Sequence, residues 1–436
     1  MPRRYESVEL SPQARLRREH ERAILRAIIT GATVSRTQLA ADHGLSAQSV
    51  GRIVRDLLDA GLVEEVSTGR PAGPGAPRRG PDAPRTGPGA PRIGLRMRPD
   101  GAYALGFGLE RDRLTGVLLD LRARPRWRMS MATPPGQPAA EVLQTIARQV
   151  RSVLAQPEFA DTRSRLCGVG IAAPGPIDCA TGSIVGAPNF PHWQHVDVAE
   201  ELGRGLELPV VMENDATAAA IGTNWRRHRG LEPFLYCTWG VAIGGGLVVD
   251  DQAYLGTTGN AMEIGHVVVN PGGRPCDCGG VGCLEAEASV TAILSDAASY
   301  GEFGTVDAVV AAAQSAAAKS GPLADLLTRA AERLATALLT AVNLVDVDEV
   351  IIGGEHFRAV ERIFLPIIRD VLRTRAFRRP IAATKITVST LEAANAVGAA
   401  ALVFHTLLRP GAPARPGGGA LNHRPRSNFH QPGYQR

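Results

Sequence analysis

The chain has 436 residues, which is enough for two or three domains that each have a core. It contains no apolar run of about 18 residues and no apolar segment near its start, so we expect a cytoplasmic protein without a membrane span or signal peptide. Six cysteines are too few for a disulfide framework. Residues 1–98 carry 17 arginines against 10 acidic residues, a net charge of +7 in a chain whose total is +5, which indicates an anionic partner for this part.

Residues 15–66 predict three helices followed by a strand. Ser35 is a suitable N-cap for a short helix that Gly44 would end, and Ser46 is one for the next helix. Gly61 ends that helix, and the segment LVEEV begins a strand. Apolar residues recur at helical spacing in the first and third helices, namely Ile24, Leu25, Ile28, Ile29, Val50, Ile53, Val54, Leu57 and Leu58. This order of elements is typical of a winged helix-turn-helix.

The third helix would place its exposed residues in the major groove of a double-stranded DNA operator. Glutamine can pair with adenine and arginine with guanine through two hydrogen bonds each. The candidate DNA-binding residues of this helix are Gln48, Ser49, Arg52 and Arg55. The alternative is a small helical bundle used for dimerisation or regulation. The tight turn, the following strand and the basic excess together favour DNA binding.

Two segments are predicted to lack a packed fold. Residues 67–98 hold seven prolines between Pro71 and Pro91, which exclude regular helix or sheet there and predict a linker rich in Pro, Gly and Arg. Within it, Arg70 in TGRPAG could enter a narrow minor groove, although a plain linker residue is the alternative. Residues 409–436 are poor in hydrophobic residues, and we expect a disordered tail.

Residues 99–408 alternate apolar strand-like runs with helical patterns, which predicts an α/β body. Three of the six cysteines and one histidine crowd into residues 266–283 of this body. The four are His266, Cys276, Cys278 and Cys283. One imidazole and three thiolates complete a tetrahedral shell, which predicts a structural Zn²⁺ with no open coordination position. Unliganded reduced thiols are the alternative, whereas Cys167, Cys179 and Cys237 sit in apolar surroundings typical of core residues.

The segment GHVVVNPGGRPCDCGGVGCLE resembles the zinc signature of the ROK family, which contains bacterial sugar kinases and sugar-responsive repressors. Four further segments resemble that family: GVGIAAPGPIDCATGSIVGAPNFPHW, VVMENDATAAAIG, GNAMEIGHVVV and VDEVIIGGEHF. The resemblance covers roughly residues 100–408. It implies a two-lobed actin/hexokinase-like sugar-binding body that forms a homodimer or homotetramer. With a winged helix in front of the body, the chain resembles the transcription regulators of the family.

The resemblance also implies a set of sugar-contacting residues. Carboxylate, amide and imidazole groups can answer the paired donors and acceptors of sugar hydroxyls. Asp215 stands where the kinases have their catalytic base. His266 could bind zinc, sugar or both. The positions that match the family's sugar contacts are Asn189, Asn214, Asp215, Glu263, His266 and Glu285.

The segments that would hold ATP depart from the kinase pattern. The family's kinases have an Asp-x-Gly-Gly-Thr turn after their first strand, where this chain has GFGLERD. Gly108 replaces the aspartate, and Glu110, Arg111 and Asp112 replace the last three residues. Acidic side chains there repel phosphate, so we expect ATP binding to be lost while the sugar-contacting positions are kept. We therefore predict a sugar-responsive repressor of carbohydrate-metabolism genes that is not an enzyme. A sugar kinase fused to a DNA-binding domain is the alternative, as is a regulator that senses a phosphosugar or a partner protein.

Overall fold

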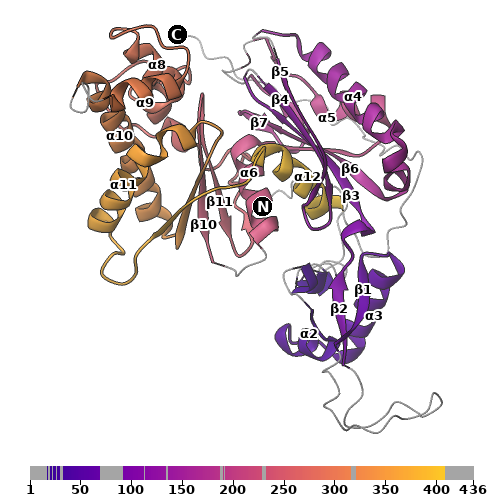
Figure 1. The fold of residues 1–436 in the computed structure, drawn as a ribbon. Coiled ribbons are helices and arrows are strands. Elements are labelled where there is room, and N and C mark those ends of the chain that lie inside the picture. The colour runs from indigo at the N-terminus through magenta and orange to yellow at the C-terminus, as the bar shows by residue number, and fades with distance from the viewer. Residues whose placement is uncertain are drawn as a thin grey trace, which may run out of the picture.

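In the computed structural model of the chain, two lobes lie side by side, each built on a five-stranded sheet, and a smaller N-terminal unit packs against the first lobe (Figure 1). The structure describes residues 17, 20–21, 23–25, 27–29, 33–68, 92–111, 113–133, 136–186, 190, 192–227, 232–315 and 321–407. Within these ranges, no helix combines the length and the apolar character needed to cross a membrane.

The N-terminal unit contains the two predicted helices α2 (Arg36–Asp42) and α3 (Ala47–Asp59). The Ser35 hydroxyl accepts a hydrogen bond from the Gln38 N–H at 3.2 Å, and the Ser46 hydroxyl accepts one from the Ser49 N–H at 3.1 Å. Both predicted N-caps are therefore confirmed. The buried face of α3 is also the predicted one, formed by Val50, Ile53, Val54 and Leu57.

An antiparallel pair follows the helices, formed by β1 (Val63–Thr68) and β2 (Arg92–Met97). The sequence placed residues 92–97 in a linker, and that boundary is wrong. Leu95 and Met97 are buried under the helices, a period-two pattern that the neighbouring prolines masked. The proline-rich segment is thus an insertion between two paired strands; residues 69–91, which include Arg70, lie outside the described residues.

The first lobe has a sheet with strand order β5-β4-β3-β6-β9. Its strands are β3 (Tyr103–Leu109), β4 (Arg113–Asp120), β5 (Pro125–Ala132), β6 (Leu166–Ala173) and β9 (Val210–Asn214). Helices α4 (Ala139–Ala155) and α5 (Val198–Leu206) cover one face, and α12 (Ala394–Leu407) covers the other. The short elements of the lobe are η1 (Pro99–Gly101), η2 (Pro157–Arg165), β7 (Ile177–Asp178) and β8 (Ser183–Ile184).

The second lobe has a sheet with strand order β12-β11-β10-β13-β14. Its strands are β10 (Phe234–Trp239), β11 (Ile243–Val249), β12 (Gln252–Ala253), β13 (Glu349–Gly353) and β14 (Lys385–Val388). Helix α6 (Asp215–Arg227) packs on one face of this sheet. The other helices of the lobe are η3 (Ile264–His266), α7 (Leu284–Ala288), α8 (Val290–Ala297), α9 (Val306–Gln314), α10 (Pro322–Val345) and α11 (Phe357–Arg375).

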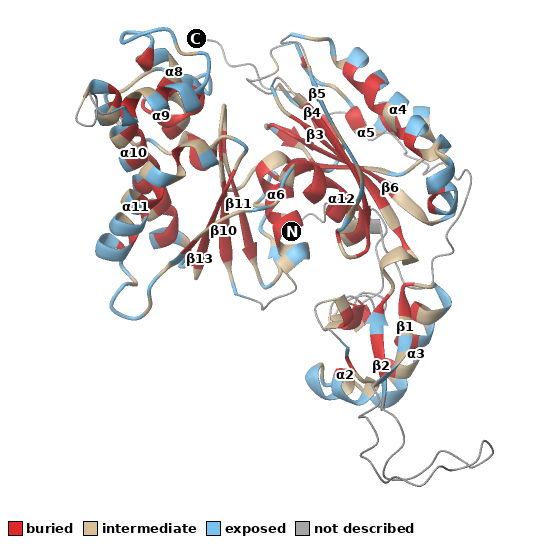
Figure 2. Cartoon of the chain, in the orientation of Figure 1, coloured by how far each residue is buried: buried red, intermediate tan, exposed pale blue. Residues whose placement is uncertain are grey.

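The two sheets share one topology. In each, the first three strands form an antiparallel meander, the fourth lies parallel to the first, and the fifth lies parallel to the fourth. Figure 2 shows buried residues along the central strands of both sheets and along α6 and α12, which lie between the sheets. This duplication confirms the predicted two-lobed α/β body.

Helices α6 and α12 cross at very short range. A Cβ atom added at Gly398 of α12 would lie 1.7 Å from the Ala218 carbonyl oxygen of α6, and one added at Gly222 would lie 2.8 Å from the Gly398 backbone. Glycine at both positions lets the two backbones touch. The crossing fixes the start of α6, at Asp215, relative to the start of α12.

Candidate functional site

Asn214 and Asp215 lie where β9 ends and α6 begins. The Asn214 side-chain oxygen accepts hydrogen bonds from the Ala216 and Thr217 N–H groups at 3.0 and 3.2 Å, so it caps the helix. Because the oxygen is engaged in this way, the Asn214 amide nitrogen is the atom offered to a ligand. The Asp215 carboxylate accepts from the Ala216 N–H at 2.7 Å, which orients it at the same helix start.

Polar groups from both lobes converge on Gly175. A Cβ atom added there would lie 3.3 Å from Asn260 Oδ1 and Glu263 Oε1 and 3.4 Å from Asn214 Nδ2. Asn260 also exchanges two hydrogen bonds with the backbone of Ile177, both 3.0 Å long, and so ties the loop before Glu263 to the first lobe. The sequence analysis missed Asn260, although the residue lies within the quoted segment GNAMEIGHVVV.

Three carboxylates of the predicted sugar-contacting set influence one another. Burial raises the pKa of Asp215 to about 6, and the charge of Glu285 contributes. Burial raises the pKa of Glu263 to about 7, helped by the charges of Asp215 and Glu285. Glu285 accepts a hydrogen bond from the Ile243 N–H at 2.8 Å, and burial raises its pKa as well. Together with the Asn214 amide, these groups can accept from and donate to several hydroxyls of one small polyol.

The predicted metal ligands also come together. The four ligand atoms of His266, Cys276, Cys278 and Cys283 lie within 4.8 Å of one another. His266 Nδ1 lies 3.6 Å from Cys276 Sγ, and Cys278 Sγ lies 3.7 Å from Cys283 Sγ. A tetrahedral zinc with Zn–S of about 2.3 Å and Zn–N of about 2.0 Å requires separations of about 3.5 and about 3.8 Å. The four residues therefore form a cluster that can hold a metal ion.

A buried acid that sequence reasoning missed anchors the cysteine loop. Glu287 of α7 accepts a hydrogen bond from the Arg274 N–H at 2.7 Å and forms an ion pair of 2.8 Å with Arg333 of α10. These contacts lower the pKa of Glu287 against the effect of its burial. The cysteine loop is thus attached to α7 and α10 by these contacts, in addition to the connection that the His/Cys cluster makes. Glu287 follows Glu285 by two residues, but nothing in the sequence marks its distant partner Arg333.

The turn after β3 has a different construction from a phosphate-binding loop. The Glu110 N–H donates to the Arg113 carbonyl at 2.8 Å, so this amide is not free for a phosphate. The Glu110 carboxylate accepts a hydrogen bond from Asn395 Nδ2 of α12 at 2.8 Å. Burial raises the pKa of Glu110 to about 7, helped by the charges of Asp215 and Glu355. Arg113 forms a 3.0 Å ion pair with Glu355, which follows β13 in the second lobe.

The remaining predicted residues fall into three groups. Gln48, Arg52 and Arg55 are exposed on α3, while Ser49 is half-buried and hydrogen-bonds with Ser46. Cys179 and Cys237 are buried as expected, and Cys167 is partly buried. The predicted positions Asn189, Arg70 and Asp112 lie outside the described residues.

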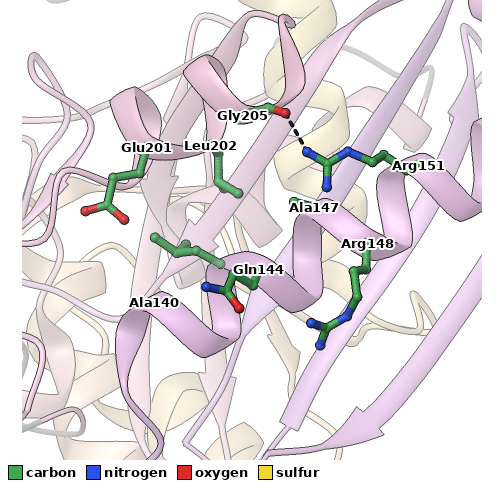
Figure 3. Close-up of a pocket in the computed structure, with 9 residues that line it drawn as sticks. Ala140, Gln144, Ala147, Arg148, Arg151, Glu201, Leu202 and Gly205 are labelled. Carbon is green, nitrogen blue, oxygen red and sulfur yellow. Dashed lines mark hydrogen bonds between the residues drawn. The ribbon is translucent and has the colours of Figure 1, made fainter.

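A groove on the outer face of the first lobe is separate from these residues. It has a volume of about 410 Å³ and lies between α4 and α5, where Arg151 donates a hydrogen bond to the Gly205 carbonyl at 2.6 Å (Figure 3). Its lining includes Leu143, Ala147 and Arg148. Among the described residues, none of the predicted sugar or metal ligands lines it, so it is not the candidate site.

Comparisons with known proteins agree with this architecture. The chain is 27% identical over 399 residues to the putative xylose repressor of Caldicellulosiruptor sp. (strain Rt8B.4), covering 88% of this chain and 95% of that protein. It is 36% identical over 217 residues to the glucokinase of Thermotoga maritima, covering 47% of this chain and 68% of the kinase. A crystal structure of a ROK family transcriptional regulator, described as a homologue of the E. coli MLC protein, superposes with a TM-score of 0.72 at 22% identity, over 90% of this chain and 96% of that chain.

The sequence profile of the ROK family matches residues 106–406, which span both lobes. The match runs from β3 to α12 and includes the described sugar-contacting candidates and the metal-ligand cluster. The predicted resemblance and the actin/hexokinase-like fold are therefore confirmed. This chain belongs to the ROK family.

Proposed function

We propose that this chain is a DNA-binding transcriptional repressor whose operator binding is modulated by a sugar or sugar derivative. The observation that carries the proposal is the similarity to a putative xylose repressor over 88% of the chain. The aligned share of the chain is larger than residues 106–406, the part that the family profile matches, so the similarity extends beyond the two lobes. The glucokinase similarity covers only 47% of the chain.

Helix α3 supplies the proposed DNA-reading surface. Gln48, Arg52 and Arg55 are exposed on one side of it, while its apolar side is buried in the N-terminal unit. In a homodimer, two copies of α3 would meet successive major grooves of a pseudo-palindromic operator. The proposed DNA-binding unit comprises residues 15–97, with residues 69–91 inserted between β1 and β2; Arg70 stays a candidate for the minor groove.

Replacing Arg52 with alanine should weaken operator binding by about 1–3 kcal/mol and relax the base preference at one position in each half-site. The full chain would first be used to select its operator from random DNA. Affinities would then be measured at one fixed salt concentration, because phosphate contacts make them salt-dependent.

Arg373→Ala is the matched control, since Arg373 is exposed on α11 in the second lobe and pairs with Asp370 of its own helix. Equal affinity and base preference for the wild type and Arg52→Ala would contradict the proposed role of α3.

The sugar site is proposed to comprise Asn214, Asp215, Glu263, His266 and Glu285, with Asn189 as a further candidate. His266 turns Nδ1 toward the cysteines, so Nε2, on the other side of the ring, is left for a sugar hydroxyl. A structural zinc on the four ligands would join η3 to the start of α7. Glu263 directly precedes η3 and Glu285 lies in α7, so the metal would set the spacing of two sugar-binding acids.

The route from the sugar site to the DNA would run through packed backbone. β2 passes directly into η1 and β3, and the Arg98 N–H donates to the Leu62 carbonyl at 2.9 Å. A Cβ atom added at Gly101 of η1 would lie 2.5 Å from the Gly61 oxygen, so η1 touches the turn before β1. A sugar that changes the closure of the lobes would therefore move the strands of the DNA-binding unit.

Adding the correct sugar to the operator complex should change its footprint. A footprint that no sugar changes would contradict this proposal.

We also propose that the chain is not a kinase. The Glu110 side chain and the closed Glu110–Arg113 turn support this, because they take the place of glycines and free amides. A phosphoryl-transfer assay with ATP, magnesium, hexoses and N-acetylhexosamines is expected to give no turnover above the solution rate. Because Asp215 stands at the position of the kinase base, ATP-dependent turnover that Asp215→Asn removes would establish the kinase alternative.

A further inference from the structure

We propose that Glu110 makes this protein reject effectors that carry a phosphate, so that its effector is an unphosphorylated sugar. The inference rests on the proposed function, because it concerns the specificity of the same sugar site. It assigns a selective role to a residue in the turn that replaces a phosphate-binding loop.

The Glu110 carboxylate is held in a fixed position. Asn395 Nδ2 holds its carboxylate at 2.8 Å, and the Asn395 oxygen is itself fixed by the Ala396 N–H at 2.7 Å and the Thr115 hydroxyl at 3.4 Å. A Cβ atom added at Gly108 would lie only 2.6 Å from the Asn395 side chain, so this amide is closely packed on β3. The carboxylate is therefore held in position by the first lobe and does not swing freely in solvent.

The charges that act on Glu110 are mostly negative. Asp215 of α6 and Glu355 beyond β13 both act on it as negative neighbours, while Arg113 of β4 acts as a positive one. Arg113 already pairs with Glu355 at 3.0 Å. Asp215 is in turn an electrostatic neighbour of Glu263 and Glu285. A phosphate placed between Glu110 and Asp215 would add a further negative charge to this acidic group.

Arg111 is the residue that could oppose the exclusion. It is exposed in the same turn, and its charge acts on Glu285, whose pKa it helps to lower against burial. One exposed guanidinium already facing a carboxylate is a weak phosphate ligand, since solvent screens it and Glu285 competes for it. The balance of charge at this end of the site therefore favours a neutral hydroxyl over a phosphate ester.

The size of the effect depends on pH. Glu110 can take up a proton when a phosphate binds beside it. The free-energy penalty that Glu110 imposes on phosphate binding therefore cannot exceed the free energy of protonating Glu110. With a pKa of about 7, the largest possible loss of phosphate affinity grows about tenfold for each pH unit above 7. Discrimination by Glu110 should therefore be slight at pH 7 and at most about thirtyfold at pH 8.5.

The test is calorimetric binding to the full-length chain at pH 7 and pH 8.5. The probes are glucose, N-acetylglucosamine and xylose, together with glucose 6-phosphate and N-acetylglucosamine 6-phosphate. For the wild type, we expect an unphosphorylated sugar to bind and its ester to bind much more weakly at pH 8.5. Glu110→Gln should strengthen ester binding by up to about thirtyfold at pH 8.5, while the parent sugar changes less than about threefold.

Two further variants separate charge from size and from general effects. Glu392→Gln is the control, because Glu392 is exposed just before α12 and its carboxylate pairs with Arg128 on the edge strand β5. Glu110→Gly removes both the charge and the bulk. Recovery of ester binding in Glu110→Gly without recovery in Glu110→Gln would overturn exclusion by charge, as would an ester that binds the wild type as tightly as its parent sugar at pH 8.5. If no sugar and no ester binds any variant, the sugar-effector function itself is overturned.

Discussion

Replacing Cys283 with serine is expected to abolish zinc binding at the proposed site and, with it, the proposed response of operator binding to sugar. Cys283 is the most buried of the four ligands, with 2% of its surface exposed, and it is also the N-cap of α7. Losing one thiolate leaves three protein ligands, which hold zinc more weakly than four, and metal-binding free energy contributes directly to local folding. We expect a loss of about 3 kcal/mol or more in unfolding free energy and a zinc content well below one per chain.

The measurements are zinc content by mass spectrometry, thermal unfolding, and footprinting with and without sugar. Cys167→Ala is the control, because Cys167 is partly buried on β6 and lies outside the cluster. It should keep one zinc per chain and the full sugar response. Cys283→Ser protein that lacks zinc but responds normally to sugar would show that the metal does not shape the sensing site.

The N-terminal helices and the metal cluster could be predicted because their signals are local. Ser35 and Ser46 cap helices whose hydrogen bonds reach only three residues along the chain. The four metal ligands lie within eighteen consecutive positions, 266–283, and their residue types alone indicate zinc. In both cases, the partners of a functional group are its neighbours in sequence.

The missed features depend on partners that are distant in sequence. Asn395 and Glu110 are 285 residues apart, and Asn260 lies 83 residues from Ile177. Only the packing of α12 on β3, and of the loop before η3 on the first lobe, brings these groups together. A local pattern therefore identified Glu110 as a departure from a phosphate loop without revealing what holds it.

The error at β2 has a different origin. Residues 92–97 carry an apolar residue at every second position, which is a strand signal, but they directly follow a run of prolines. The composition of the whole segment masked the periodicity of residues 92–97. The correction matters for function, because it makes the insertion part of the DNA-binding unit and leaves η1 as the short connection to the sugar-binding body.

Replacing Gly398 with alanine should strongly destabilise the body. In an ordinary helix interior, glycine to alanine stabilises by about 0.5–1 kcal/mol. Here the new Cβ atom would lie 1.7 Å from the Ala218 oxygen and 2.2 Å from its carbonyl carbon, and backbone atoms cannot rotate away as a side chain does. The two helices would have to separate, so we expect a loss of at least about 3 kcal/mol in unfolding free energy, at the upper end of what overpacking costs.

Gly205→Ala in α5 is the matched control, because a Cβ atom there meets nothing within 4 Å. Chemical denaturation of both variants should leave Gly205→Ala within about 1 kcal/mol of the wild type. If Gly398→Ala folds with less stability, its sugar binding should also weaken, because the crossing fixes Asp215 relative to Asn395 and hence to Glu110. A Gly398→Ala variant as stable as the wild type would mean that α6 and α12 can separate freely, and the crossing could then not set the geometry of the sugar site.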